Sequence, residues 1–196
     1  MMSDDADRGL ELFRAGDFPL YTLTFVRDLP PDELLRRMGV DEETLAPRDA
    51  RELSEEFADD FYDADEPVVT TGSDGGWTWA WEQGGTHGLD DRVLRAVSAG
   101  TRAVVLHHNE KPMDRFRYAV DRESVVDFDT LGPVRPVGGD PTRLDPFMRP
   151  LGLVPGGVAP LYSVLALCEN AFGIRLARPA ESDEERWSGR LLPLPY

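Results

Sequence analysis

Three strand-type segments follow one another closely in the middle of the chain, and they constrain its fold more than any other feature. They cover Thr101 to His108, Met113 to Val120 and Ser124 to Phe128, with four residues in the first connection and three in the second. Connections this short join antiparallel neighbours, because a parallel pair needs a crossover of about a dozen residues or more. The sequence therefore predicts an antiparallel meander in this part of the chain.

Other strands and several helices alternate irregularly around the meander. Apolar periodicity predicts helices over Pro31 to Met38, Arg48 to Tyr62, Leu89 to Val97, Pro141 to Met148 and Pro160 to Phe172. Further strands are expected over Leu20 to Arg27, Val68 to Thr71 and the segment GWTWAWEQ. Because this order has no regular βαβ alternation, we predict an α+β fold. It would have a single, largely antiparallel sheet of about five to six strands, with helices packed mainly on one face.

The segment GWTWAWEQ places three tryptophans on one side of a strand, at Trp77, Trp79 and Trp81. A tryptophan face of this kind is either part of a core or an exposed platform for a peptide or an apolar ligand. We favour the core, because the other side of the strand is better suited to water. That other side carries Thr78, Ala80 and Glu82.

The chain has 196 residues, which is the length of one compact domain. We expect a lead-in segment over residues 1–19, the domain over 20–178, and a C-terminal strap or partly disordered tail over 179–196. The single cysteine, Cys168, cannot form an intramolecular disulfide, and the N-terminus is acidic where a signal peptide would be positive. The longest mostly apolar stretch is interrupted by Gly and Pro. These features predict a soluble cytoplasmic protein with no membrane partner.

The formal net charge is −16, from 37 acidic and 21 basic residues. This excess disfavours nucleic-acid binding, which needs clustered Lys and Arg. The charge is also regional: residues 1–66 hold 20 acids and 7 bases, a net of −13, whereas residues 67–196 hold 17 acids and 14 bases, a net of −3. A one-sided negative field can steer a positive partner toward one surface. The sequence therefore favours a basic protein partner.

Much of the acidity falls on one predicted helix and the residues after it. The candidate partner-binding residues there are Glu52, Glu55, Glu56, Asp59, Asp60 and Asp63. Runs of this kind are commonly a solvated helix face. Each i,i+4 pair of carboxylates, however, destabilises the helix by a few tenths of a kcal/mol. Because this cost is repeated along the helix, a binding role has to be weighed against a solvated helix face.

A second group of candidates could form a cleft at the sheet edge. It consists of Glu82, His107, His108, Asn109, Arg115 and Arg117, which could supply a carboxylate, an imidazole and a guanidinium for acid–base work on a small molecule. The two adjacent histidines point to opposite faces of a strand, so they cannot bind one metal ion without a bulge. Zinc spacings, phosphate-binding glycine loops and a G-x-S-x-G elbow are all missing from the sequence. We therefore expect no metal and no cofactor.

An ordered set of segments carries a family resemblance. The segments are YTLTFVRDL, PPDELLRRMGV, GWTWAWEQ, VLRAVSAGTRAVVLHHN, RFRYAVDRESVVDFD and GGDPTRLDPFM. In this order they resemble a family of uncharacterised small domains of unknown function that is widespread in high-GC bacteria. The resemblance spans roughly Tyr21 to Leu176 and implies no activity, cofactor or catalytic residue. The acidic segment from Arg48 to Tyr62 and the tail after Pro179 lie outside it.

Two functions from different classes follow. The first is a noncatalytic interaction protein, immunity-like or a regulatory adaptor, that presents its acidic helix to a basic partner. The second is a small-molecule-binding protein or an enzyme with the sheet-edge cleft described above. Strong salt dependence of binding is expected for the first, and a ligand-induced rise in melting temperature that needs His107 and His108 is expected for the second.

Overall fold

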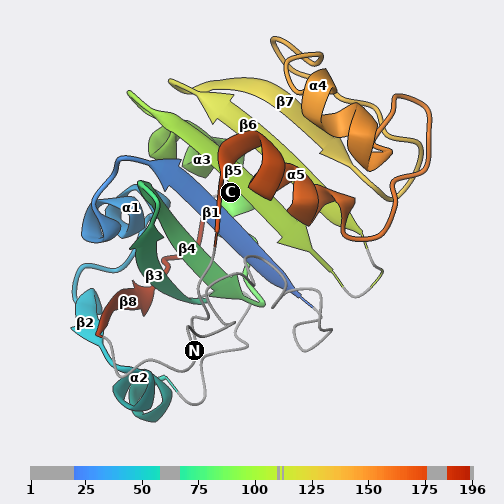
Figure 1. Ribbon diagram of the computed structural model, residues 1–196. Coiled ribbons are helices and arrows are strands. Elements are labelled where there is room, and N and C mark those ends of the chain that lie inside the picture. The colour runs from blue at the N-terminus through green and yellow to red at the C-terminus, as the bar shows by residue number, and fades with distance from the viewer. Residues whose placement is uncertain (1–19, 58–66, 110, 112, 176–184, 195–196) are drawn as a thin grey trace, which may run out of the picture.

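The computed structural model describes residues 20–57, 67–109, 111, 113–175 and 185–194, so the expected lead-in over residues 1–19 lies outside the described residues. Its centre is an eight-stranded antiparallel sheet with the strand order β2-β8-β3-β4-β1-β5-β6-β7 (Figure 1). The strands are β1 Tyr21–Arg27, β2 Ala46–Arg48, β3 Val68–Asp74, β4 Trp77–Gln83, β5 Arg102–His108, β6 Asp114–Val120, β7 Glu123–Asp129 and β8 Arg186–Arg190. The helices are α1 Pro31–Met38, α2 Ala50–Glu56, α3 Asp91–Val97, α4 Asp145–Met148 and α5 Ser163–Phe172. Two 3-10 turns, η3 His87–Leu89 and η4 Arg149–Leu151, complete the regular elements.

The predicted meander is confirmed. Strands β5, β6 and β7 are consecutive antiparallel neighbours, and β5 also pairs with β1. The α+β class and the single antiparallel sheet are confirmed with it. The short connections leave no room for a crossover, which is why this part of the topology follows from the chain itself.

The sheet has eight strands, so the expected number of five to six is wrong. The two strands that the sequence did not indicate are β2 and β8, which pair with each other. Strand β2 is only three residues long and contains Pro47, and β8 has the sequence RWSGR, which lacks a clear apolar alternation. Both are strands because β8 inserts between β2 and β3, far from either in sequence. The segment expected as a C-terminal strap therefore contributes a strand to the sheet.

Helices cover both faces of the sheet, and the expectation that they would pack mainly on one face is wrong. One apolar cluster joins α1 and α3 to residues such as Val26, Ala80 and Val105. The other joins α5 and Met148 of α4 to Leu23, Phe116 and their neighbours on the opposite side of the same strands. In Figure 1, α4 and α5 lie on the near side of the sheet and α3 on the far side. The domain thus has two cores separated by one sheet.

The tryptophan face of β4 belongs to a core. Trp77 and Trp79 are buried, and Trp81 is partly buried against the same cluster. The ring of Trp79 lies directly over Gly72 of β3, where a Cβ atom would collide with it. The other side of β4 was expected to face water, but Thr78, Ala80 and Glu82 are also buried there. The reason is the second helical layer, which covers the face that the alternation alone marked as polar.

Helix α2 begins with a capping box. The carboxylate of Asp49 accepts from the backbone N–H of Glu52, and the Glu52 carboxylate accepts from the backbone N–H of Asp49. Such a box satisfies N–H groups at the first turn and fixes the helix start. Arg48, expected in the helix, instead ends β2. Helix α2 ends at Glu56, and residues 58–62 of the expected helix lie outside the described residues.

Candidate functional site

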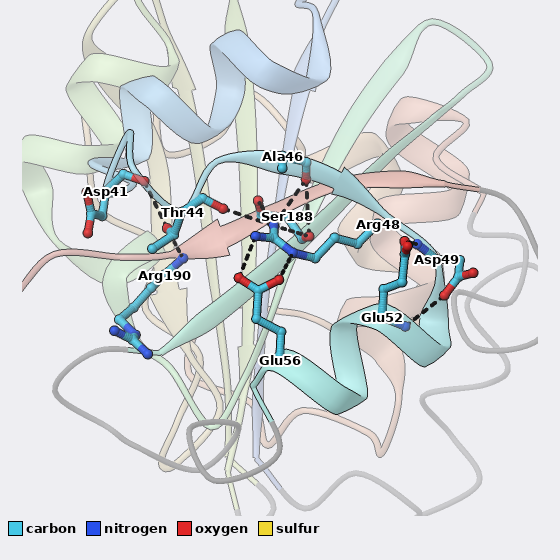
Figure 2. A network of polar contacts seen from close by, with 9 residues as sticks. All are labelled: Asp41, Thr44, Ala46, Arg48, Asp49, Glu52, Glu56, Ser188 and Arg190. Atoms are coloured by element: carbon cyan, nitrogen blue, oxygen red, sulfur yellow. Dashed lines mark hydrogen bonds and ion pairs between the residues drawn. The ribbon is translucent and has the colours of Figure 1, made fainter.

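The first candidate site lies where β2 and α2 meet the C-terminal strand, and it is organised by Arg48 (Figure 2). The Arg48 side chain is only 9% exposed. Its Nη1 donates to the carbonyl oxygens of Thr44 and Ser188 at 2.9 and 3.1 Å, and its Nε and Nη2 donate to the two carboxylate oxygens of Glu56 at 2.6 and 2.8 Å. This two-bond pairing holds α2 against the edge of the sheet.

An aromatic ring lies beneath this network. Phe57, directly after α2, is 2% exposed. The guanidinium groups of Arg48 and Arg190 lie over its ring, 5.0 and 5.8 Å from the centroid. Cations over an aromatic face are attracted by its negative quadrupole. The acidic helix is therefore anchored to the domain by one aromatic residue and two arginines.

Three of the predicted partner-binding acids are described, and all three are exposed on α2. Glu52 belongs to the capping box, Glu55 pairs with Arg51 at 3.2 Å, and Glu56 pairs with Arg48. The hydrogen bond from Arg48 lowers the pKa of Glu56 below its ordinary value, so this carboxylate stays charged. The other three predicted residues, Asp59, Asp60 and Asp63, lie outside the described residues.

An open hollow of about 510 Å³ separates α2 from β2. Its lining consists of Ala46, Pro47, Arg48, Glu52, Glu55 and Glu56. Half of these residues are glutamates, and the only basic side chain among them is already held by Glu56. The lining of the hollow thus presents carboxylate oxygens and a small apolar surface to a binding partner.

The second group of candidates divides between the two faces of the sheet. The face covered by α1 and α3 carries Glu82, His107, Arg115 and Arg117. Glu82 and His107 both pair with Thr22, Arg115 pairs with His107, and Arg117 pairs with Val105 of the core on that face. His108 lies on the opposite face, where its ring stacks on Tyr21 at 5.3 Å between centroids. Asn109 follows β5, and its side-chain oxygen accepts from the backbone N–H groups of Lys111 and Met113.

Glu82 is fully buried, although it was expected to border a cleft. Its two carboxylate oxygens accept hydrogen bonds from the backbone N–H groups of His87 and Gly88, at 2.7 and 2.9 Å. Burial raises the pKa of Glu82 to about 7, and the two N–H groups act in the opposite direction. Glu82 therefore fastens the loop after β4 to the sheet, and its carboxyl titrates near neutral pH.

His107 lies next to this loop across β1. Its Nδ1 is 3.0 Å from the hydroxyl of Thr22, which donates to the carbonyl oxygen of Gly85 at 2.7 Å. Because the hydroxyl hydrogen is used on Gly85, His107 donates from Nδ1 in this arrangement. Burial is the main cause that lowers the pKa of His107, and His108 adds to it. The imidazole is consequently neutral at physiological pH.

The two arginines of β6 are held by acids on neighbouring elements. Arg117 is buried, and it donates to Asp127 of β7 at 2.9 Å, to the carbonyl oxygen of Leu89, and to Asp91 of α3. Arg115 is more exposed and donates to both oxygens of the same Asp127 at 3.2 Å. The guanidinium groups thus join α3 to the far end of the sheet.

Among the partners of these candidates that sequence reasoning missed, one had a signal in the sequence. Asp114, the first residue of β6, accepts from Nδ1 of His108 at 2.7 Å, and its register partner in β5 is the same histidine. The signal was available, because Asp114 follows a short connection and therefore has to face the end of β5. In the part of the chain that the structure describes, no three His, Cys, Asp or Glu side chains gather as a possible metal site.

The profile of a family of unknown function, DUF6461, matches residues 10–179. The chain belongs to this family. The DUF6461 match runs through β2 and α2, so the acidic segment lies within the span of the family although the sequence resemblance left it out. It ends before β8. No curated protein and no solved structure matches the chain. Among the described residues of this DUF6461 member, no helix is long and apolar enough to cross a membrane.

Proposed function

We propose that the protein is a noncatalytic, cytoplasmic interaction domain, immunity-like or a regulatory adaptor, that presents the acidic side of α2 to a basic protein partner. The supporting observation is the hollow between α2 and β2, which is open and lined by Glu52, Glu55 and Glu56. Residues 48–56 contain four acids and two arginines, a net charge of −2, and residues 57–66 add five acids and no base. A cationic surface would meet unbalanced carboxylates here.

The rigid support of this surface favours binding over simple solvation. The start of α2 is fixed by its capping box, and its end is fixed by Arg48 and the buried Phe57. A charged surface held in one conformation loses little side-chain and backbone entropy when a partner docks. A solvated helix face needs no such anchoring.

The second candidate group gives less support to a small-molecule site. Glu82, His107 and Arg117 are each buried and hydrogen-bonded within the protein. A general acid or base has to come within hydrogen-bond reach of a substrate. These side chains would have to give up their present partners first.

The proposal can be tested with a fluorescent nona-arginine peptide as the cationic probe, measured by anisotropy at about 0.05 and 0.5 M salt. We expect the affinity to fall at least tenfold at the higher salt. The double variant E52Q/E55Q should weaken binding at low salt at least threefold, because it removes two charges from the hollow. The capping box stays complete in this variant, since a glutamine side chain can accept the same backbone N–H as the glutamate that it replaces.

The matched control is E123Q/D74N, which removes the same charge from two exposed residues on other elements. It should leave the affinity within about twofold of the wild type, since exposed charges farther away than the Debye length, about 14 Å at the lower salt, are largely screened. Equal weakening in the two double variants would show that only net charge matters, and the proposed surface would then be wrong.

A further inference from the structure

The loop after β4 is fastened to two parts of the molecule by one acid and one histidine. Glu82 binds the loop to the sheet through the N–H groups of His87 and Gly88. The ring of His87 binds the loop to the C-terminal segment, since its Nε2 lies 3.0 Å from the carbonyl oxygen of Leu192. The backbone N–H of Leu192 in turn donates to the carbonyl oxygen of Gly39, after α1. One pair of residues therefore connects β4, the loop and the segment that follows β8.

The contact with Leu192 fixes the tautomer of His87. A carbonyl oxygen can only accept, so Nε2 carries the hydrogen. In the neutral ring, Nδ1 then has a lone pair, and it lies 3.8 Å from Oε2 of Glu82. This distance is too long for a hydrogen bond but short enough for a strong electrostatic interaction at a buried site. A neutral His87 beside an ionised Glu82 would place two acceptors against each other.

The surroundings of Glu82 supply no other compensating charge. His87 is the only basic side chain within ion-pairing distance of the Glu82 oxygens in the part of the chain that the structure describes. The adjacent strands contribute Thr22 and Val69 at the paired positions, neither of which is charged. The neutral His107 lies beyond Thr22. Burial lowers the pKa of His87, and the hydrogen bond to Leu192 and the nearby Asp90, at the start of α3, act in the opposite direction without reversing that shift.

The loop packs closely over the carboxylate of Glu82, which is fully buried. A Cβ atom on Gly88 would lie 2.5 Å from the hydroxyl oxygen of Thr24, and one on Gly85 would lie 2.7 Å from Oε2 of Glu82. The Thr24 hydroxyl is itself buried without a hydrogen-bond partner among the described residues. An ionised Glu82 can therefore be hydrated only if the loop moves away from the sheet.

We propose that Glu82 and His87 form a proton-operated latch. While the pair retains a proton, the latch holds the loop of residues 84–89 and the C-terminal segment after β8 against the sheet. Loss of this proton releases both segments. The direction follows from linkage. Opening hydrates Glu82 and returns its pKa to the ordinary value of 4.5, which is lower than the value of about 7 in the closed form. Opening also returns the lowered pKa of His87 to its ordinary value of 6.5, so below that pH the proton that His87 takes up offsets the one that Glu82 releases. Opening therefore becomes more favourable mainly as the pH rises from about 6 to 8.

The experiment is amide hydrogen exchange of the full chain at several pH values from 6 to 8.5, with each rate corrected for the intrinsic pH dependence of exchange. The reporters are the amides of His87, Gly88 and Leu192, and Phe116 in β6 reports global unfolding. We expect the protection factors of the three reporters to lie below that of Phe116 at every pH, as a local opening requires, and to fall at least twofold over this range. Constant protection factors, or protection factors equal to that of Phe116, would overturn the latch.

Two variants separate the parts of the latch. In E82Q, the protection factors of the reporters should no longer fall as the pH rises, whereas the exposed control E123Q should behave like the wild type. In H87A, Gly88 should still respond to pH while Leu192 should not, because the bond to the C-terminal segment is gone. A pH response of Leu192 that persists in both variants would show that another group is responsible. If E82Q does not fold, the wild-type measurement and H87A still decide the question.

Discussion

The guanidinium of Arg48 donates a hydrogen bond from Nη1 to the carbonyl oxygen of Ser188 at 3.1 Å, although 140 residues separate the two in the sequence. The same nitrogen also lies within hydrogen-bond distance of the carbonyl oxygen of Ala46 and the hydroxyl of Ser188. Strand β8 is therefore held in the sheet by a side-chain hydrogen bond in addition to the backbone hydrogen bonds between strands. One side chain from the N-terminal third ties it to β2 and, through Glu56, to the acidic helix.

Replacing this side chain should destabilise the protein. We expect Arg48→Met to lower the free energy of unfolding by about 2–4 kcal/mol, because part-buried carbonyl oxygens lose their donor and Glu56 loses its partner. Urea unfolding measures the change. The control is Arg51→Met, whose exposed i,i+4 pair with Glu55 contributes about 0.3–0.5 kcal/mol. Similar losses in both variants would contradict a special role for Arg48.

The close fit of the loop predicts a strong effect of one methyl group. Gly88→Ala would place its Cβ 2.5 Å from the Thr24 hydroxyl and 3.2 Å from Oε1 of Glu82. We expect a loss of about 1–3 kcal/mol, because the loop has to shift and its bonds to Glu82 lengthen. Gly132→Ala is the matched control, since a Cβ there meets nothing within 4 Å. Thermal unfolding of both variants should show a lower midpoint for Gly88→Ala alone.

The buried carboxyl of Glu82 predicts a pH dependence of stability. The folded state keeps this proton up to a pKa of about 7, whereas the unfolded chain releases it near 4.5. The free energy of unfolding should therefore decrease as pH rises from about 4.5 to 7, by on the order of 3 kcal/mol at most, and then level off.

The lowered pKa values of His87 and His107 have the opposite effect on the free energy of unfolding. The stability that these two residues contribute is lost as the pH falls below the ordinary value of 6.5. The difference between the wild type and E82Q isolates the contribution of Glu82. Urea unfolding from pH 5 to 8.5 should give a wild-type curve that falls relative to E82Q over the range from 5 to 7. Parallel curves would contradict this assignment.

The buried ion pairs of Arg117 predict the largest loss of stability. Arg117→Met leaves Asp127, which is 8% exposed, without its nearer donor. We expect a loss of about 3–5 kcal/mol, because Asp127 keeps only the more exposed Arg115 and the carbonyl oxygen of Leu89 loses its donor. Arg115→Met provides the comparison, since its side chain is 43% exposed and the same Asp127 keeps Arg117. A guanidinium chloride titration should rank the two losses in this order.

Much of the fold could be read from short-range patterns. The connections after His108 and Val120 are too short for anything except antiparallel neighbours, and the periodicity around Trp79 and Leu34 marks a strand and a helix correctly. The candidate residues that the structure describes take part in polar networks. Their partners were harder to predict, because Asp127, Leu192 and Ser188 come close to them only through the pairing of distant strands.

By itself, then, the sequence determined the strand meander, the approximate positions of the helices and the concentration of acidic charge before residue 67, because each depends on neighbours in the chain. The tertiary structure decided what local patterns cannot encode. It placed β8 between β2 and β3, covered the polar side of β4 with a second helical layer, and buried Glu82 beneath a loop. The reason is physical: burial depends on which elements meet across the sheet, and that choice is made by long-range packing, not by the alternation within one strand.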